Sequence, residues 1–188
     1  MRAMGQRVDD VLVVGGGPAG LAAALFLARA GLSVTVLDAG KSPLGQVARV
    51  PNFPARPDAP SGPDLLLDLR RQVEGHGGRF LAGYAVDVSD QGGVFVVRRE
   101  EGDELFAERL LLATGQDLRL VGILGLERSG TFVETDRGGR TSYPRVYAAG
   151  RLRGLVPEHA ATSAGDGAWV AVHLISDLRG EPYEDHSK

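Results

Sequence analysis

Cysteine is absent from all 188 residues of the chain. Its absence excludes disulfide bonds, thiolate catalysis, cysteine-ligated zinc and a redox-active CxxC pair in this sequence. An excess of positive charge is lacking too, because 21 lysines and arginines stand against 24 aspartates and glutamates. We therefore expect no nucleic-acid partner. The four histidines show no ligand spacing, so we expect no metal site.

One uncharged run, residues 11–28, follows Arg2 and Arg7 in the manner of a signal peptide or a membrane anchor. Two aspartates stand at its entrance, and three glycines and a proline interrupt its middle at residues 15–18. Glycine and proline in that position disfavour a continuous helix. We therefore expect a cytoplasmic protein with no membrane partner.

Glycine, in contrast, is abundant at 27 of 188 residues, which indicates tight turns or close approaches of backbone to a ligand. The first forty residues predict a strand at 11–14, a glycine turn, a helix at 21–30 and a strand at 33–37. Such a βαβ unit implies a parallel sheet with a right-handed crossover.

The remaining pattern completes an α/β fold in which residues 1–180 form a single domain and residues 181–188 a polar tail. A helix is expected at 65–75, capped by Ser61 or Asp64. Prolines recur every third residue from 51 to 63; this spacing suits polyproline II, but we favour a surface loop. Further strands are expected at 79–81, 84–88, 94–98 and 104–107, the last three as an antiparallel meander, then buried strands at 110–113 and 146–149, and a C-terminal helix at 158–178.

Gly15-x-Gly17-x-x-Gly20 follows a predicted strand and precedes a predicted helix, the context that gives this fingerprint meaning. Gly15 would permit the tight turn, Gly17 the approach of a pyrophosphate, and Gly20 the packing of helix on strand. The helix N-terminus would then present its free N–H groups to the phosphates. A glycine-rich turn without a ligand is the alternative.

Asp38 lies eighteen residues after Gly20, at the end of the second strand. A carboxylate there can accept hydrogen bonds from an adenosine ribose and would repel a 2′-phosphate. The pair favours FAD or NAD over NADP, unless Asp38 is an ordinary surface residue. The fingerprint alone does not choose between FAD and NAD.

Several motifs resemble the FAD domain of thioredoxin reductases and related pyridine-nucleotide disulfide reductases. They are residues 15–20, Gly45-Gln46, residues 52–54, residues 111–115 and residues 147–150 with the helix after them. In that family a complete NADPH domain with a CxxC pair lies between the last two motifs. Here only residues 116–148 separate Gly115 from Ala149, with neither cysteine nor GxGxxG. The chain therefore resembles the single-domain, FAD-only relatives of thioredoxin reductase, which implies a Rossmann-like FAD-binding fold, non-covalent FAD and a homodimer.

Fingerprint and resemblance together give seventeen candidate cofactor-binding residues. They are Gly15, Gly17, Pro18, Ala19, Gly20, Asp38, Ala39, Gly45, Gln46, Asn52, Ala113, Thr114, Gly115, Gly150, Arg151, His159 and Ala160. Arg151 departs from the family, which has an aspartate there; it would pair with a phosphate or face solvent. His159 and Ala160 would place the first turn of the last helix at the flavin, although His159 is also a plausible surface residue.

Three functions follow from these residues. The first is an FAD-dependent oxidoreductase that takes hydride from a free NAD(P)H or electrons from a redox partner protein. The second is a non-catalytic flavin carrier or redox sensor. The third is an NAD-binding module without flavin, which the matches at residues 52–54 and 147–150 disfavour. No catalytic acid, base or nucleophile is identified, because the flavin would carry the chemistry.

Overall fold

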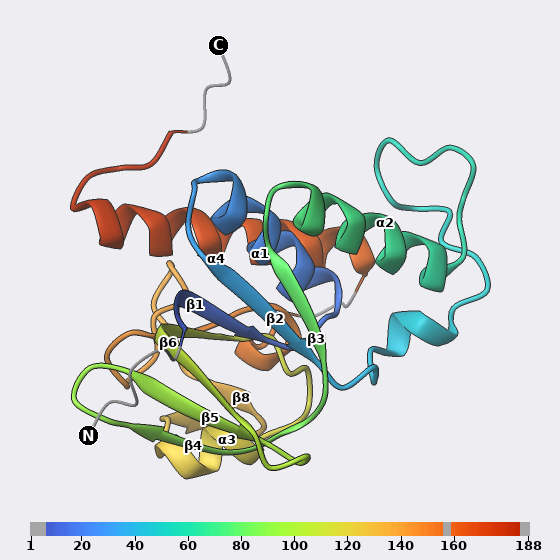
Figure 1. The fold of residues 1–188 in the computed structure, drawn as a ribbon. Helices are drawn as coiled ribbons and strands as arrows, with labels where there is room; N and C mark the ends of the chain where they lie inside the picture. Colours follow the sequence, from blue (N-terminus) through green and yellow to red (C-terminus); the bar gives the residue numbers. More distant parts are fainter. Residues whose placement is uncertain (1–6, 156–158, 185–188) are drawn as a thin grey trace.

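The computed structural model describes residues 7–155 and 159–184 of the chain. Its centre is a parallel sheet with helices packed on one face (Figure 1). The strand order across the sheet is β3-β2-β1-β6, and β9 pairs with β6. The parallel strands are β1 (Val8–Val14), β2 (Val34–Asp38), β3 (Arg79–Ala82), β6 (Glu104–Leu112) and β9 (Val146–Ala148). The prediction of an α/β fold with a parallel sheet is confirmed.

The central strands are apolar on both faces of the sheet. In β1, Val11 and Val13 join the core under the helices, whereas Leu12 and Val14 join a second core on the opposite face. All four are at most 6% exposed. A strand buried on both faces has no polar side, which is why the sequence shows a continuous apolar run instead of an alternation.

β6 corrects the prediction of two separate strands at 104–107 and 110–113. The polar pair Glu108 and Arg109 interrupts the apolar pattern, but the backbone continues through it because β1 pairs with β6 on both sides of this pair, from Phe106 to Leu112. On its other edge, β6 pairs antiparallel with β5 over its first half and parallel with β9 over its second. The meander of β4 (Ala85–Asp90), β5 (Phe95–Arg99) and β6 is thus continuous with the parallel sheet.

Three helices cover one face of the sheet: α1 (Pro18–Arg29), α2 (Gly62–Gly75) and α4 (Ala160–Arg179) (Figure 1). The meander, α3 (Arg119–Leu124) and the hairpin of β7 (Arg128–Ser129) and β8 (Phe132–Val133) lie toward the other face. Ser61 caps α2 by accepting a hydrogen bond from the Asp64 backbone N–H at 3.2 Å, as predicted. The short helices η1 (Pro43–Gln46) and η2 (Gly150–Arg153) complete the fold.

Two segments outside the predicted helices and strands differ in structure. The proline-rich segment forms an exposed loop of turns, with positive φ angles at Ala55 and Ala59, so the loop prediction is confirmed over polyproline II. Residues 116–143 lacked a sequence pattern, yet they contain α3 and the β7–β8 hairpin.

The C-terminal helix is confirmed, with His159 as the residue before its first turn. Its predicted start at Glu158 and the end of the predicted tail, residues 185–188, lie outside the described residues. Among the residues described, no helix is both long and apolar enough to cross a bilayer.

Candidate functional site

The turn between β1 and α1 has no room for a Cβ at Gly15 or Gly20. Gly15 has a φ of +111°, and a Cβ there would lie 2.4 Å from the Ala113 carbonyl oxygen. A Cβ at Gly20 would lie 1.9 Å from the Gly15 carbonyl oxygen. Gly17 caps α1, and Pro18 occupies its first turn. The fingerprint glycines thus bring the start of α1 against the ends of β1 and β6.

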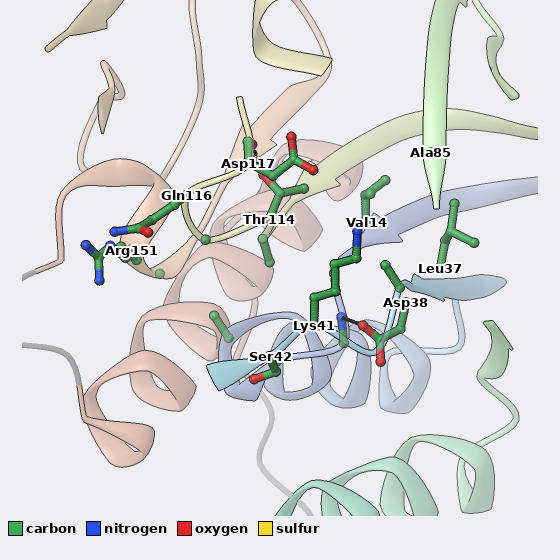
Figure 2. A pocket seen from close by; sticks show the side chains of 18 of the residues that line it. Val14, Leu37, Asp38, Lys41, Ser42, Ala85, Thr114, Gln116, Asp117 and Arg151 are labelled. Carbon is green, nitrogen blue, oxygen red and sulfur yellow. Dashed lines mark hydrogen bonds between the residues drawn. The ribbon is translucent and has the colours of Figure 1, made fainter. Parts of the chain in front are cut away.

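Asp38 is tied to this turn. Its Oδ1 accepts a hydrogen bond from the Gly16 backbone N–H at 3.1 Å, drawn in Figure 2. The Asp38 carboxylate is therefore held at the end of β2 beside the glycines. The sequence analysis did not identify Gly16; a Cβ there would lie 2.4 Å from the Asp38 carboxyl carbon.

A cavity of about 330 Å³ opens above the turn, at the carboxyl ends of the parallel strands. Eleven of the seventeen predicted residues line it: Gly15, Gly17, Pro18, Ala19, Asp38, Ala39, Ala113, Thr114, Gly115, Gly150 and Arg151. Parallel strands present their carboxyl ends along one edge, and open α/β sheets bind ligands there. The cavity thus gathers segments that are distant in the sequence.

The other six predicted residues do not line the cavity. Gly20 lies under the turn, where it allows the packing predicted for it. Gly45 and Gln46 belong to η1. Asn52 and His159, 107 positions apart, contact each other at 3.3 Å between Nδ2 and Nδ1, and Ala160 begins α4 beside them. Direct cofactor contacts by these residues stay predictions.

One end of the cavity carries a charged cluster that the sequence analysis missed. Tyr84 donates a hydrogen bond of 2.5 Å to Asp117, and Arg119 Nε donates to the Tyr84 hydroxyl at 3.3 Å. The Lys41 ammonium lies 4.6 Å from the centre of the Tyr84 ring. The hydrogen bond to Asp117, helped by burial, raises the pKa of Tyr84, so its hydroxyl stays a donor at neutral pH. Their positions just after strand ends are the signal that could have found Lys41, Tyr84 and Asp117.

Arg151 lines the cavity on the side away from Asp38, beside Gln116 (Figure 2). With its carboxamide oxygen turned toward Arg151, Gln116 accepts hydrogen bonds from the guanidinium, the one from Nε at 3.0 Å. The backbone before Arg151 is fixed as well, because the Gly150 N–H donates to Asp166 Oδ2 of α4 at 2.7 Å. Arg151 is thus held on the cavity wall by Gln116.

The charges on the cavity wall favour an anion. Lys41, Arg119 and Arg151 line it against Asp38 and Asp117. Among the described residues, no group of three histidines, aspartates and glutamates could hold a metal ion. The arrangement suits an extended ligand that has a ribose beside Asp38 and phosphates above the glycine turn.

The sequence profile of the pyridine nucleotide-disulphide oxidoreductases matches residues 9–132 and, in an overlapping match, residues 68–167. The chain belongs to this family. Thioredoxin reductase of Peptoclostridium acidaminophilum is 35% identical over 123 residues, which are 64% of this chain and 38% of that protein. NADPH-dependent thioredoxin reductase 3 of Arabidopsis thaliana is 33% identical over 121 residues, which are 61% of this chain and 23% of that protein. The chain thus spans well under half the length of these relatives.

Solved structures agree on the fold. A thioredoxin reductase from Gloeobacter violaceus matches with a TM-score of 0.88 and 19% identity, over 97% of this chain and 100% of that one. The atypical thioredoxin reductase TRi from Desulfovibrio vulgaris Hildenborough matches with a TM-score of 0.80 and 19% identity, over 92% and 99%. This member of the family therefore has the FAD-domain fold of thioredoxin reductases.

Proposed function

We propose that the chain is a flavoprotein oxidoreductase that binds one FAD non-covalently in the cavity above the glycine turn. The observation that carries the proposal is the order of groups along this single cavity. Figure 2 shows Asp38 on one side of the cavity and Gln116 and Arg151 on the other. The glycine turn and the start of α1 also line the cavity, and Gly16 of the turn contacts Asp38. A dinucleotide has the matching order of adenosine ribose, pyrophosphate and second nucleotide half.

The local geometry fits this cofactor. Gly15, Gly16 and Gly17 line the cavity in a row without side chains, so their backbone forms the floor where a pyrophosphate would lie. The N-terminus of α1 offers N–H groups and a positive dipole to the phosphates. With Oδ1 held by Gly16, Asp38 has Oδ2 left to accept a ribose hydroxyl.

When bound, FAD supplies the capacity to accept and donate electrons, and the chain supplies binding and orientation. Arg151, held by Gln116, brings a positive charge to the half of the cavity away from Asp38, where it would meet the phosphate. The absence of cysteine excludes a thioether link to the flavin. Electrons would come from a free NAD(P)H or from a redox partner protein.

We also propose that these residues are not a self-sufficient thioredoxin reductase. Residues 113–145, between β6 and β9, form α3 and a short hairpin instead of a second nucleotide-binding unit. That reaction also needs a dithiol relay, and the sequence has no cysteine.

The visible spectrum of the purified protein tests the cofactor. We expect a flavin spectrum and release of FAD on denaturation; a colourless protein that also fails to bind added FAD would overturn the proposal. Asp38→Ala should weaken FAD binding, whereas Asp87→Ala, at an exposed ion pair with Arg98, should not.

Anaerobic addition of NADH and then NADPH tests the electron donor. Bleaching of the flavin supports an oxidoreductase that uses a free nicotinamide. A flavin that only dithionite reduces would overturn the nicotinamide donor and favour the carrier or sensor instead.

A further inference from the structure

A second hollow, of about 360 Å³, lies outside the cofactor cavity and shares none of its lining residues. Arg137, Arg153, Asp166 and Trp169 line it. It borders the same η2 turn, because Gly150 and Arg151 face the cavity while Arg153 faces the hollow. Of these four side chains, only Asp166 supports the cofactor cavity, through the Gly150 N–H.

The inner part of the hollow is an ion pair whose carboxylate is already satisfied. Arg153 lies 3.3 Å from Asp166 Oδ1, with side chains only 15% and 14% exposed. The other oxygen, Oδ2, accepts the Gly150 N–H at 2.7 Å. Arg153 also donates to the Asp136 carbonyl oxygen at 3.1 Å. The negative charge of Asp166 is therefore neutralised from within the protein.

The rim presents an indole in a fixed orientation. Trp169, the single tryptophan of the chain, is 50% exposed. Its Nε1 donates to the Arg137 carbonyl oxygen at 2.8 Å, and the His173 ring packs edge-on at 4.8 Å between centroids. An aromatic ring held in this way is a stacking surface that loses little conformational entropy on binding.

Arg137 also lines the hollow. It is exposed, and within residues 7–155 and 159–184 its guanidinium takes part in neither a hydrogen bond nor an ion pair. Two guanidiniums against one carboxylate give the hollow a net positive charge. Guanidinium groups bind phosphate through paired N–H donors.

We propose that this hollow binds a nucleoside phosphate, with the base stacked on Trp169 and the phosphate on Arg137. The hollow is open to solvent, so a ligand there would be held by its stacked base and its phosphate and would remain partly exposed. Base stacking on an aromatic ring and a phosphate on a free guanidinium are the two interactions that these residues supply. The inference goes beyond the proposed function and does not depend on it.

The single tryptophan provides the test, because its fluorescence reports on the environment of the Trp169 ring, which lines this hollow. The protein is saturated with FAD, to fill the cofactor cavity, and titrated with AMP, adenosine or inorganic phosphate. We expect saturable quenching by AMP, with adenosine and phosphate each bound at least about tenfold more weakly. Arg137→Gln should raise the Kd for AMP by about tenfold or more, whereas Arg128→Gln, at an exposed arginine of β7, should leave it unchanged.

Equal affinity for AMP and adenosine, or an unchanged Kd in Arg137→Gln, would overturn the proposal. Loss of the AMP response on FAD saturation would also overturn it, because AMP would then be occupying the cofactor cavity. Calorimetry on Trp169→Ala should show weaker AMP binding than wild type, and wild-type affinity there would contradict stacking. A failure of FAD binding shows in the flavin absorbance, separately from the tryptophan signal.

Discussion

Single charged residues set both the proposed chemistry and the stability of this chain. Arg151 reverses the charge that the thioredoxin reductase resemblance leads one to expect at its position, and Gln116 holds its guanidinium. A positive charge on the cavity wall favours an anionic ligand. A guanidinium has no acceptor, so unlike the family's aspartate it cannot accept a hydrogen bond from a ligand hydroxyl. Asp9, at the amino end of β1, is instead enclosed by donors far from the cavity.

Arg151→Ala should weaken FAD binding by roughly 1 to 3 kcal/mol, the range for a charge-assisted hydrogen bond. Arg151→Asp should weaken it further, because it places a negative charge near the pyrophosphate. Titration of the apoprotein with FAD, followed by flavin fluorescence, measures both, with the exposed Arg98→Ala as control. Wild-type affinity in Arg151→Ala would place the Arg151 side chain away from the phosphate. Tighter binding in Arg151→Asp would show that the aspartate of the family still fits the ligand at this position.

Asp9→Asn should destabilise the fold by about 1 to 3 kcal/mol at neutral pH. Asp9 is 4% exposed and accepts hydrogen bonds from Thr35 at 2.5 Å, Arg7 at 2.8 Å and Arg79 at 3.0 Å. Burial acts to raise the pKa of Asp9, but the hydrogen bonds from Thr35 and Arg7 and the charge of Arg79 outweigh it and lower the pKa.

Because the pKa is lower in the folded state, the stabilisation is complete above the unfolded value of about 3.9 and is lost as the pH falls through the folded pKa. The difference between wild type and Asp9→Asn in urea unfolding should therefore shrink in acid. Asp87→Asn, at an exposed pair, should change stability by less than about 1 kcal/mol. A pH-independent difference for Asp9→Asn would contradict the assignment.

At the scale of elements, the site depends on how closely α1 and α4 approach each other. A Cβ at Gly167 of α4 would lie 2.0 Å from the Ala19 carbonyl oxygen of α1. This contact fixes α4 against the first turn of α1, and Ala19 also lines the cavity. Gly165, two residues earlier in the same helix, has no heavy atom within 4 Å of a Cβ position.

Gly167→Ala and Gly165→Ala should therefore have opposite effects on the free energy of unfolding. Gly167→Ala should destabilise by about 1 to 3 kcal/mol, because the helices must separate. Gly165→Ala should stabilise by up to about 1 kcal/mol, because alanine loses less backbone entropy in a helix. Thermal or urea unfolding of the two variants checks this, and equal effects would mean that the helices do not cross at Gly167.

At the scale of the whole molecule, the chain has one βαβ-based unit, and its match covers only 38% and 23% of the length of two thioredoxin reductase relatives. β6 and β9 pair directly, and the residues between them form a small cap of one helix and one hairpin on the second core. Such a unit supplies no dithiol.

A coupled assay with this chain, NADPH and thioredoxin should therefore stay at background. The chain has no cysteine to pass electrons from a flavin to a disulfide. The full-length Peptoclostridium acidaminophilum thioredoxin reductase is the positive control. Turnover by the chain alone would contradict the argument from the missing relay.

We expect a homodimer, as the resemblance to reductase FAD domains implies. A small domain with a partly open cofactor site gains from burying surface against a second copy. Light scattering at micromolar concentration should give a mass near twice 19.8 kDa. A mass near that of one chain would refute the dimer.

The sequence by itself determined the features that depend on local spacing. The βαβ unit, the fingerprint glycines and Asp38 after β2 follow from patterns within about thirty residues. So does a cap of α2 by Ser61 or Asp64, and the structure selects Ser61. Local sterics and side-chain chemistry decide them, so they could be predicted without coordinates. The helix α3 had no comparable pattern, and the only sequence signal for Lys41, Tyr84 and Asp117 is their position just after strand ends.

Only the tertiary structure decided which distant residues meet. β6 continues through Glu108 and Arg109 because β1 pairs along it, not because of its own residues. Gln116 meets Arg151, and Arg137 meets Trp169, because strand pairing and helix packing bring their segments together. Local propensity encodes none of these distances, since tertiary pairing overrides it. The cofactor fingerprint can therefore be predicted from the sequence, whereas the charges around it and the second hollow are set by the fold.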